Sequence, residues 1–357
     1  MTSPRPNRAR LVVTMVVLAL LAPLAACGGS DSGASSESKA VSETTASEGG
    51  GSGDGPAFPV TIEHKYGSTT IEEEPKRIVT VGLTDQDPAI ALGVKPVGTT
   101  EWYGDHDGAL WPWAAKAAAE LPGPTPKVIG TADTLKPESI LLEKPDLILA
   151  VYGGLSKGDY DRLSKIAPTV AQPKDHADYG VPWEEQTEIV GRALGRSDEA
   201  ERLVADVEDR FAAARKAYPQ LDGATALMAS PYAGKVAVYG PEDPRTRFLA
   251  ELGTEQPKDL AELSGDEFSF DLSEERTDLL DVDALLWYVN DPKKDKDEFD
   301  KRPIYANLEV HQGNHEVFVA LNDEIGGATS LVTVLSLPLL LDELTPRIAA
   351  AVDGDGE

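Results

Sequence analysis

Short apolar runs rich in β-branched residues alternate with stretches of helical periodicity from residue 58 onward. This alternation predicts buried strands joined by crossover helices, the pattern of an α/β fold. In the first half we expect strands at 77–82, 95–100, 127–130 and 146–152, and helices at 85–92, 110–120 and 137–143. In the second half we expect strands at 224–230, 235–239, 284–289 and 316–321, followed by one apolar helix over 329–344.

A longer helical stretch, residues 183–218, separates the two halves. Its apolar residues recur at helical spacing, first at Ile189, Val190, Ala193 and Leu194 and again at Leu203, Val204, Val207 and Phe211. Gly195 is expected to break or kink it. The sequence therefore predicts two α/β lobes, 58–182 and 219–352, joined by a long helix, with a nearly preformed ligand cleft between them and a short tail at 353–357.

The first 57 residues have a different character. An apolar run at 11–21 follows three arginines and has about half the roughly twenty residues that a membrane-spanning helix needs, so it predicts a signal peptide over 1–26. Small residues precede Cys27, the only cysteine, and the motif resembles a bacterial lipobox, in which that thiol is lipidated. Residues 27–57 then form a lipidated cysteine and a flexible polar tether. We expect the protein on the extracellular face of the cell membrane, held by a lipid anchor.

The net charge limits the kinds of partner that this chain can bind, and the cysteine content limits how its fold can be stabilised. The formal net charge is -28, which disfavours nucleic acid and anionic lipid surfaces, because both attract clusters of Lys and Arg. A neutral or cationic ligand suits this chain better. With Cys27 as its only cysteine, the mature chain forms no internal disulfide, so the fold must rest on a hydrophobic core.

Aromatic residues gather where the expected strands end. Ligands of α/β sheets bind beyond the carboxyl ends of the strands, so these loops are the candidate site. Arg245 and Arg247, in a proline-bounded loop, could donate to ligand oxygens, although an internal ion pair would also explain them. Each aromatic residue equally fits plain core packing, and on a strand only one of Trp287 and Tyr288 can face the cleft. The aromatic candidates are Trp102, Tyr103, Tyr152, Tyr232, Tyr239 and Trp287.

Several tracts resemble one known family in their order and spacing. They lie at 75–79, 91–98, 144–149, 166–170, 239–249 and 335–338. Over 58–352 the chain resembles the helix-linked substrate-binding lipoproteins of ABC importers for ferric siderophores, haem and vitamin B12. Within that family it is most similar to the actinobacterial iron-siderophore branch.

The resemblance implies a receptor and not an enzyme, with no catalytic residues. Such a receptor captures a ferric siderophore, here of hydroxamate type, and delivers it to an ABC permease; haem or a corrinoid is the alternative ligand. Aromatic faces grip the ligand, among which Trp102, Tyr152 and Tyr232 are favoured, and Arg247 is favoured over Arg245. The siderophore itself supplies the ligands of the iron, so no cofactor and no direct metal site are expected. We also expect a monomer.

The resemblance also assigns two acidic residues to permease docking. Glu138 and Glu275, one per lobe, match family positions that meet arginines of the permease, and Glu274 competes with Glu275 for the second position. An acid at an exposed helix start is stabilised by the helix dipole and presents its charge outward. Ordinary helix-start acids would show the same pattern.

Two other classes of function remain open. Residues 154–158 fit the G-x-S-x-G elbow of hydrolases around Ser156, for which His176, His311 or His315 would have to act as base, but no oxyanion-loop motif precedes it. Asp105, His106 and Asp107 could begin a direct metal site, yet no other histidine has a spacing that completes it. The acidic run 291–300 lacks the ligand order of a calcium loop and is expected to be solvated.

Overall fold

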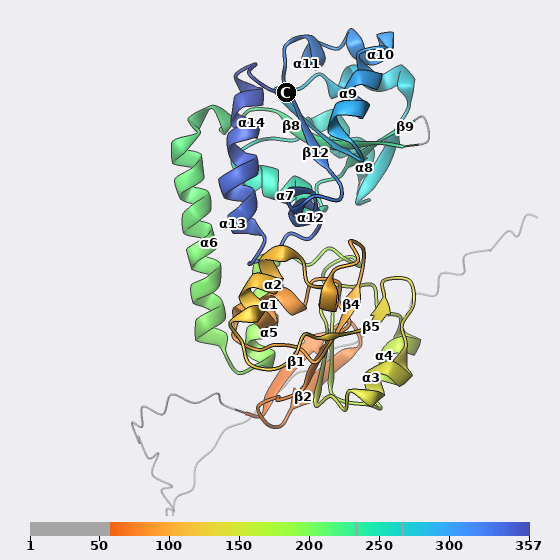
Figure 1. The fold of residues 1–357 in the computed structure, drawn as a ribbon, viewed down its shortest axis with the longest axis vertical. Helices are drawn as coiled ribbons and strands as arrows, with labels where there is room; N and C mark the ends of the chain where they lie inside the picture. The colour runs from red at the N-terminus through yellow and green to blue at the C-terminus, as the bar shows by residue number, and fades with distance from the viewer. Residues whose placement is uncertain (1–57, 233–234, 266) are drawn as a thin grey trace, which may run out of the picture. The chain divides into compact units, whose positions relative to one another are not determined.

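The computed structural model describes residues 58–232, 235–265 and 267–357 (Figure 1). The signal peptide, Cys27 and the tether expected at 1–57 lie outside the described residues. Two five-stranded sheets covered by helices form two α/β lobes, which confirms the predicted fold class. Every strand expected from the apolar runs is present within a few residues of its expected limits. Within the described part of the chain, no helix combines the length and the apolar character needed to cross a membrane.

The N-terminal lobe is built on five parallel strands in the order β5-β4-β3-β6-β7. These strands are β3 (Ile78–Thr80), β4 (Gly98–Glu101), β5 (Lys127–Thr131), β6 (Leu147–Ala150) and β7 (Thr169–Ala171). The helices that follow them are α1 (Gln86–Ala91), α2 (Pro112–Ala119), α3 (Pro137–Leu142) and α4 (Lys157–Leu163), with a 3-10 turn at Asp107–Ala109. Because helices cover both faces of a parallel sheet, β6 is buried along its whole length.

An antiparallel hairpin, β1 (Val60–His64) and β2 (Gly67–Ile71), completes this lobe. The sequence analysis did not predict it, because polar residues alternate with only a few apolar ones. Ile62 and Ile71 are buried and pack into the same cluster as Leu147 and Leu149 of β6. The hairpin therefore covers part of one face of the sheet.

The C-terminal lobe has a mixed sheet in the order β10-β9-β8-β11-β12. Strands β8 (Ala226–Tyr232), β11 (Ala284–Val289) and β12 (Glu316–Ala320) run parallel, whereas β9 (Lys235–Tyr239) and β10 (Ser269–Leu272) pair antiparallel. The helices are α7 (Pro244–Glu251), α8 (Lys258–Ser264), α9 (Pro292–Phe299), α10 (Pro303–Ala306), α11 (Glu309–Gln312), α12 (Glu324–Ser330), α13 (Leu337–Leu339) and α14 (Thr345–Val352). Short 3-10 segments lie at Pro219–Leu221 and Glu274–Leu280, and a π-helical turn at Leu340–Leu344 joins α13 to α14.

The stretch between the lobes forms two helices, α5 (Trp183–Ala193) and α6 (Ser197–Ala217). Gly195 separates them with φ of +67°, a left-handed conformation that glycine adopts without strain, so the predicted break is confirmed. Ile189 and Val190 of α5 pack into the core of the N-terminal lobe, while Phe211 of α6 packs into that of the C-terminal lobe. Helix α6 therefore links the lobes, Trp183 at the start of α5 also packs into the C-terminal core, and Figure 1 shows α6 running past both lobes.

The apolar segment at 329–344 is not the single helix that its hydrophobicity predicts. Helix α12 ends at Ser330, and a turn follows before α13 begins at Leu337. In this turn the Ser336 hydroxyl accepts from Thr333 N at 2.9 Å and donates to the Leu331 carbonyl at 2.7 Å. These side chains satisfy backbone groups that a helix would otherwise pair, which is how Ser and Thr compete with helix formation.

The last residues are docked rather than forming a free tail. The amide of Glu357 donates to the carbonyl of Glu316 on β12 at 2.9 Å, and that of Gly356 donates to the carbonyl of Asn314 at 2.8 Å. Arg347 pairs with the Glu357 carboxylate at 2.6 Å. The segment expected as a tail at 353–357 thus belongs to the C-terminal lobe.

Candidate ligand-binding cleft

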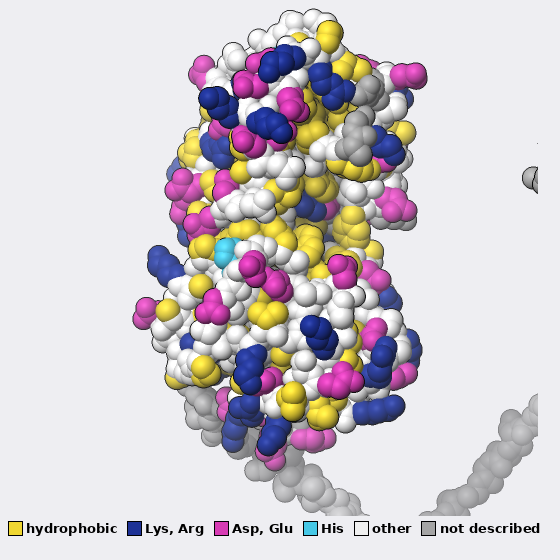
Figure 2. Space-filling view, turned by 45° about the vertical axis from the view of Figure 1, so that its right-hand side comes forward, with side chains coloured by type: hydrophobic (Ala, Val, Ile, Leu, Met, Phe, Trp, Pro, Cys, Tyr) yellow, Lys and Arg dark blue, Asp and Glu magenta, His cyan; other side chains and the backbone are white. Residues whose placement is uncertain are grey.

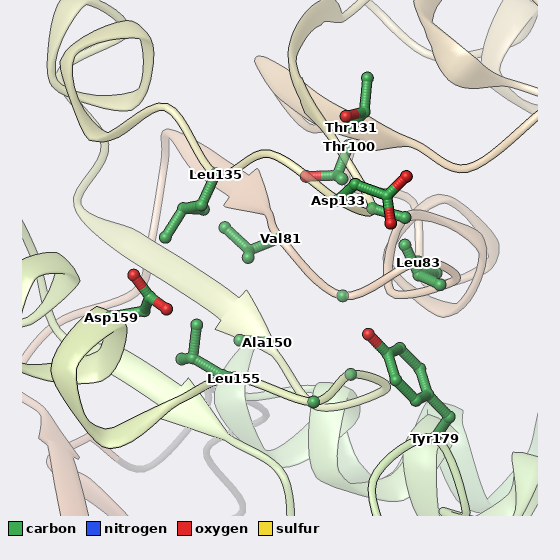
Figure 3. Close-up of a pocket in the computed structure, with 14 residues that line it drawn as sticks. Val81, Leu83, Thr100, Thr131, Asp133, Leu135, Ala150, Leu155, Asp159 and Tyr179 are labelled. Atoms are coloured by element: carbon green, nitrogen blue, oxygen red, sulfur yellow. The ribbon is translucent and has the colours of Figure 1, made fainter. Parts of the chain in front are cut away.

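The carboxyl ends of the N-terminal strands open onto a cavity of about 150 Å³ (Figure 3). Thr100 and Thr131 lie at the ends of β4 and β5, and Figure 3 shows Tyr179 reaching toward them from the opposite wall. Strand ends and the loops after them supply the remaining walls, which are Val81, Gly82, Leu83, Ala132, Asp133, Leu135, Ala150, Gly153, Gly154, Leu155 and Asp159. The cavity lies where ligands of parallel sheets are expected.

A cluster of tyrosines and one arginine joins the two lobes. The hydroxyl of Tyr103, from the N-terminal lobe, lies 3.3 Å from that of Tyr288 on β11. The Tyr288 hydroxyl lies 2.5 Å from the Ser330 hydroxyl of α12. The Arg245 guanidinium stacks over the ring of Tyr239 at 3.9 Å and lies 5.9 Å from that of Tyr288. The structure thus brings together Tyr103, Tyr239 and Arg245, which the sequence proposed separately.

Trp102 presents an aromatic face to solvent beside this cluster. Its side chain is 42% exposed, which is unusual for so large an apolar group. Its ring meets that of Tyr103 edge to face at 5.0 Å, and Tyr103 in turn packs on Trp111 at 5.1 Å. A buried aromatic base holds the exposed indole in place, so it can stack on a ligand at low entropic cost.

Tyr152 lies buried where the lobes meet. Its backbone N–H donates to the buried carboxylate of Asp85 at 2.9 Å, and its ring centroid is 6.2 Å from that of Tyr179. Burial raises the pKa of the Tyr152 hydroxyl, and the Asp243 carboxylate raises it further. The hydroxyl therefore stays protonated and can donate a hydrogen bond to a ligand oxygen.

Both candidate arginines lie in α7 and not in the predicted loop, and each pairs with an acid just before that helix. Arg245 binds both carboxylate oxygens of Asp243, through Nε at 2.7 Å and Nη2 at 2.8 Å. Arg247 donates to Glu242 at 2.5 Å and, across the lobes, to the Gly180 carbonyl at 2.7 Å. Their charges are neutralised within the protein, so the cleft offers little positive potential to an anionic ligand.

The family profile described as periplasmic binding protein matches residues 78–319. The chain belongs to the periplasmic binding protein family. Members of this family bind substrates and are not enzymes, so this chain is a binding protein. The two-lobed fold with strand ends facing the lobe junction agrees with that assignment.

Three relatives show how far the similarity extends. A Bacillus subtilis protein named "Probable siderophore-binding lipoprotein YfiY" is 27% identical over 271 residues, which are 72% of this chain and 79% of the relative. A periplasmic solute binding protein of Mycobacterium smegmatis is 34% identical, with a TM-score of 0.72 over 82% of this chain and 98% of the other. PiaA of Streptococcus pneumoniae, solved in complex with ferrichrome, is 28% identical, with a TM-score of 0.74 over 83% and 99% of the two chains.

One predicted cleft residue of this periplasmic binding protein lies elsewhere, whereas Tyr232 stays a candidate. Trp287 is fully buried, packs on Phe299 at 4.6 Å and donates to Glu316 at 2.6 Å, so the prediction that it lines the cleft is wrong. Neighbouring strand residues face opposite sides of a sheet, and here Tyr288 is the one that reaches the cleft. Tyr232 lies nearly half exposed on the β8 and β9 hairpin, and its hydroxyl donates to Asp271.

Sequence reasoning did not select three side chains that the structure places at the cleft. Tyr179 lies in the loop before α5, far from any predicted strand end, and no periodic pattern marks it. Ser330 is the second residue of the helix expected over 329–344. Tyr288 is the alternative to Trp287 in the sequence, and its polar tip in an apolar run is the signal that marks it.

The serine of the hydrolase-like motif is a helix cap. Ser156 Oγ accepts from Asp159 N at 3.1 Å and donates to the Asp159 carboxylate at 2.5 Å, which caps α4. The candidate bases have other partners, since His176 pairs with Glu185 at 2.6 Å and His311 pairs with Glu316 at 2.7 Å.

Of the candidate metal ligands, His106 is used in packing, whereas Asp105 and Asp107 are exposed. The ring of His106 packs on that of Trp111 at a tilt of 57°, with 4.3 Å between ring centroids. In the described part of the chain, no three His, Cys, Asp or Glu side chains lie close enough together to hold a metal ion.

The two acids assigned to docking are exposed, one on each lobe. Glu138 lies in the first turn of α3, and Glu275 lies in the 3-10 segment Glu274–Leu280. Figure 2 shows apolar side chains gathered along the junction of the lobes with acidic side chains at its edge. Both acids can therefore reach a partner from solvent.

Proposed function

We propose that this protein captures a ferric siderophore of hydroxamate type between its lobes. The relatives support the class of ligand, since one is named as a siderophore-binding lipoprotein and another was solved with ferrichrome. The exposed indole of Trp102 and the tyrosines behind it suit the apolar shell of such a complex.

The pairing of both arginines with acids is the observation that carries the choice of hydroxamate. Three hydroxamates balance the charge of Fe(III), whereas three catecholates leave a triple negative charge. Arg245 and Arg247 already neutralise Asp243 and Glu242, and Asp133 and Asp159 line the neighbouring cavity. An anionic complex would meet more negative than positive charge here, so a neutral or cationic complex binds better.

A titration of intrinsic tryptophan fluorescence tests this function. The panel contains a ferric trihydroxamate, a ferric tricatecholate, ferric citrate, haem and cobalamin, each added to the purified protein. We expect saturable quenching by the hydroxamate at the lowest concentration, because Trp102 lies at the cleft. Tighter binding of the catecholate, citrate, haem or cobalamin would overturn the proposed ligand class.

Delivery to an ABC permease is the second part of the proposal. Glu138 and Glu275 suit this role because they are exposed acids on separate lobes and can pair with arginines of a permease. Retention at the membrane is the third part. Residues 1–26 act as a signal peptide, Cys27 carries the lipid, and residues 28–57 form the tether; the relative YfiY is itself named a lipoprotein.

A further inference from the structure

A second cavity, of about 410 Å³, lies between the start of α5 and one face of α7. Val181, Trp183 and Val332 form much of its apolar wall, and Glu184, Arg247 and Glu251 line it with charge. Val181 comes from the N-terminal lobe, Trp183 from the start of α5 and Val332 from the C-terminal lobe, so the cavity straddles the lobe junction. None of these residues except Arg247 takes part in the cleft described above.

Two acidic side chains and one basic side chain line this cavity, and the basic one has its partners elsewhere. Arg247 is occupied by Glu242 and the Gly180 carbonyl, as described above. Glu251 accepts a single hydrogen bond of 3.2 Å from Trp183 Nε1. Arg215 on α6 donates to the backbone carbonyl of Glu251 at 2.5 Å, not to its carboxylate.

The carboxyl groups of Glu184 and Glu251 thus line one cavity, and the cation that lines it with them, Arg247, forms its ion pair with Glu242. Burial, and then the negative charge of Glu184, raises the pKa of Glu251 to about 8. Burial also raises the pKa of Glu184. Glu208 of α6 adds negative charge, and Arg215 offsets part of it.

We propose that this cavity binds an alkylammonium group. An ammonium carries three hydrogen-bond donors, which the Glu184 and Glu251 carboxyl groups lining the cavity can accept, and its alkyl stem can lie on Trp183 and Val332. An anionic group would be repelled, and a purely apolar group would leave the acids without a partner. The ammonium comes either from an arm of the ferric hydroxamate in the neighbouring cleft or from a separate small amine. The first source rests on the proposed function, whereas the second does not.

The Arg247 side chain is common to the second cavity and the ligand cleft. Its side chain lines this cavity, and its charge also acts on the Tyr152 hydroxyl of the cleft. A ligand that enters the cleft with a cationic arm can therefore place that arm behind Arg247, on the acids that α5 and α7 contribute.

Binding of a cation should be coupled to release of a proton. Near neutral pH the Glu251 carboxyl holds a proton, and an ammonium favours its ionised form. Affinity for the ammonium should therefore rise as pH increases toward 8 and level off above it. The groups that set this response are Glu184 and Trp183 on α5, Glu208 and Arg215 on α6, and Arg247 on α7.

The test uses a linear ferric trihydroxamate with a terminal primary amine, its N-acetylated form, and hexylamine without iron, each measured by isothermal titration calorimetry. We expect the wild-type protein to bind the amine complex about tenfold more tightly than the acetylated one, a difference typical of one well-placed charge pair. This preference should vanish in Glu251→Gln and in Glu184→Gln. Glu201→Gln is the control, since Glu201 is exposed on α6 and does not line this cavity.

The results distinguish a siderophore arm from a separate amine as the source of the ammonium. They also distinguish failure of the ammonium site from failure of the proposed function. Preference for the amine complex without hexylamine binding assigns the cavity to the siderophore arm. Hexylamine binding that Glu251→Gln abolishes, with equal affinity for both ferric complexes, assigns it to a separate amine. Equal affinity for both complexes together with no hexylamine binding overturns the inference while leaving the proposed function intact. Failure of both complexes to bind overturns the proposed function, and hexylamine then tests the cavity alone.

Discussion

The indole of Trp111, from the N-terminal lobe, packs directly on the backbone of Gly327 in α12 of the C-terminal lobe. A Cβ at position 327 would lie 2.1 Å from Cζ3 of that ring. On its other edge the ring lies against Gly104, where a Cβ would be 2.9 Å from Cζ2. The His106 ring also packs on this indole, at 4.3 Å between centroids and a tilt of 57°, which restricts its movement. Contact between the lobes at this point therefore depends on glycine.

We expect Gly327→Ala to lower the free energy of unfolding by about 1 to 3 kcal/mol through overpacking against Trp111. Alanine is the better helix former by about 1 kcal/mol, so a loss of stability identifies the clash. Urea unfolding followed by circular dichroism measures the difference. Gly158→Ala is the matched control, because a Cβ there meets its nearest atom, Ser156 Oγ, at 3.9 Å, and its stability should be equal or higher. Equal stability of Gly327→Ala and the wild type would contradict the packing argument.

Asp87 should make stability depend on pH. Its buried Oδ2 accepts from Trp113 Nε1 at 2.8 Å and, across the lobes, from Thr333 Oγ1 at 2.7 Å. Burial raises its pKa from 3.8 to about 6, so the folded state holds a proton that the unfolded state has lost. The protonated Asp87 carboxyl therefore contributes fully to the stability of the folded state below pH 4. About 3 kcal/mol of the free energy of unfolding is lost as pH rises from 4 through 6.

Asp87→Asn should remove this pH dependence while keeping an oxygen for both donors. Unfolding free energies of the variant and the wild type, measured between pH 4 and pH 8, should diverge with increasing pH, with the variant becoming the more stable. Parallel curves would refute the assignment of this pH dependence to Asp87.

Asp85→Asn is the comparison, because the carboxylate oxygens of Asp85 accept from the amides of Val151 at 2.7 Å and Tyr152 at 2.9 Å. In Asp85→Asn the side-chain NH2 group would face one of these backbone N–H groups. Two facing donors cannot hydrogen-bond, so the free energy of unfolding should fall by about 1 to 3 kcal/mol.

The two tryptophans proposed from the sequence should separate binding from stability. Trp102→Ala removes an exposed ring and should weaken hydroxamate binding by about 1 to 3 kcal/mol with little change in unfolding. Trp287→Ala empties a fully buried site and should lower stability by about 3 to 5 kcal/mol. Calorimetric titration and urea unfolding of both variants give the comparison. If Trp287→Ala weakened binding and Trp102→Ala did not, the placement of Trp102 at the cleft and of Trp287 in the core would be wrong.

Glu138→Ala combined with Glu275→Ala should impair delivery and leave capture unchanged. Charge pairs at a docking surface orient the partner, and these acids lie on the exterior of the two lobes. We expect normal affinity of the purified double variant and slower uptake of labelled ferric siderophore by cells that depend on it. Glu201→Ala with Glu309→Ala removes the same charge from α6 and α11 as a control, and Glu274→Ala tests the neighbouring acid. Normal uptake in the first double variant would refute the docking assignment.

Cys27→Ser should release the protein from the membrane without unfolding it. Serine cannot carry the thioether-linked lipid, while the described fold begins beyond this residue. Fractionation of cells that express the variant should find it in the soluble fraction with ligand affinity intact. Retention in the membrane fraction would show that something other than Cys27 holds the protein there.

The sequence by itself was sufficient for features that depend on neighbouring residues. A run such as Leu147–Ala150 is apolar because helices cover both faces of its sheet, and that pattern is visible without the fold. Gly195 ends α5 through its own left-handed backbone, which is a local property. The alternation of such elements was therefore enough to determine two α/β lobes and a connecting helix.

The tertiary structure alone decided features that depend on residues far apart in the chain. Trp287 and Tyr288 are both aromatic and adjacent, and packing on the two faces of the sheet places them in different core clusters. Of the two, it is the Tyr288 hydroxyl that lies 3.3 Å from that of Tyr103 in the other lobe. The break after Ser330 places Thr333 on Asp87, 246 residues away, and no hydrophobic pattern near Thr333 records that partner. A periodic pattern reports which face of an element is apolar, whereas the partner of a buried polar group is set by the other lobe.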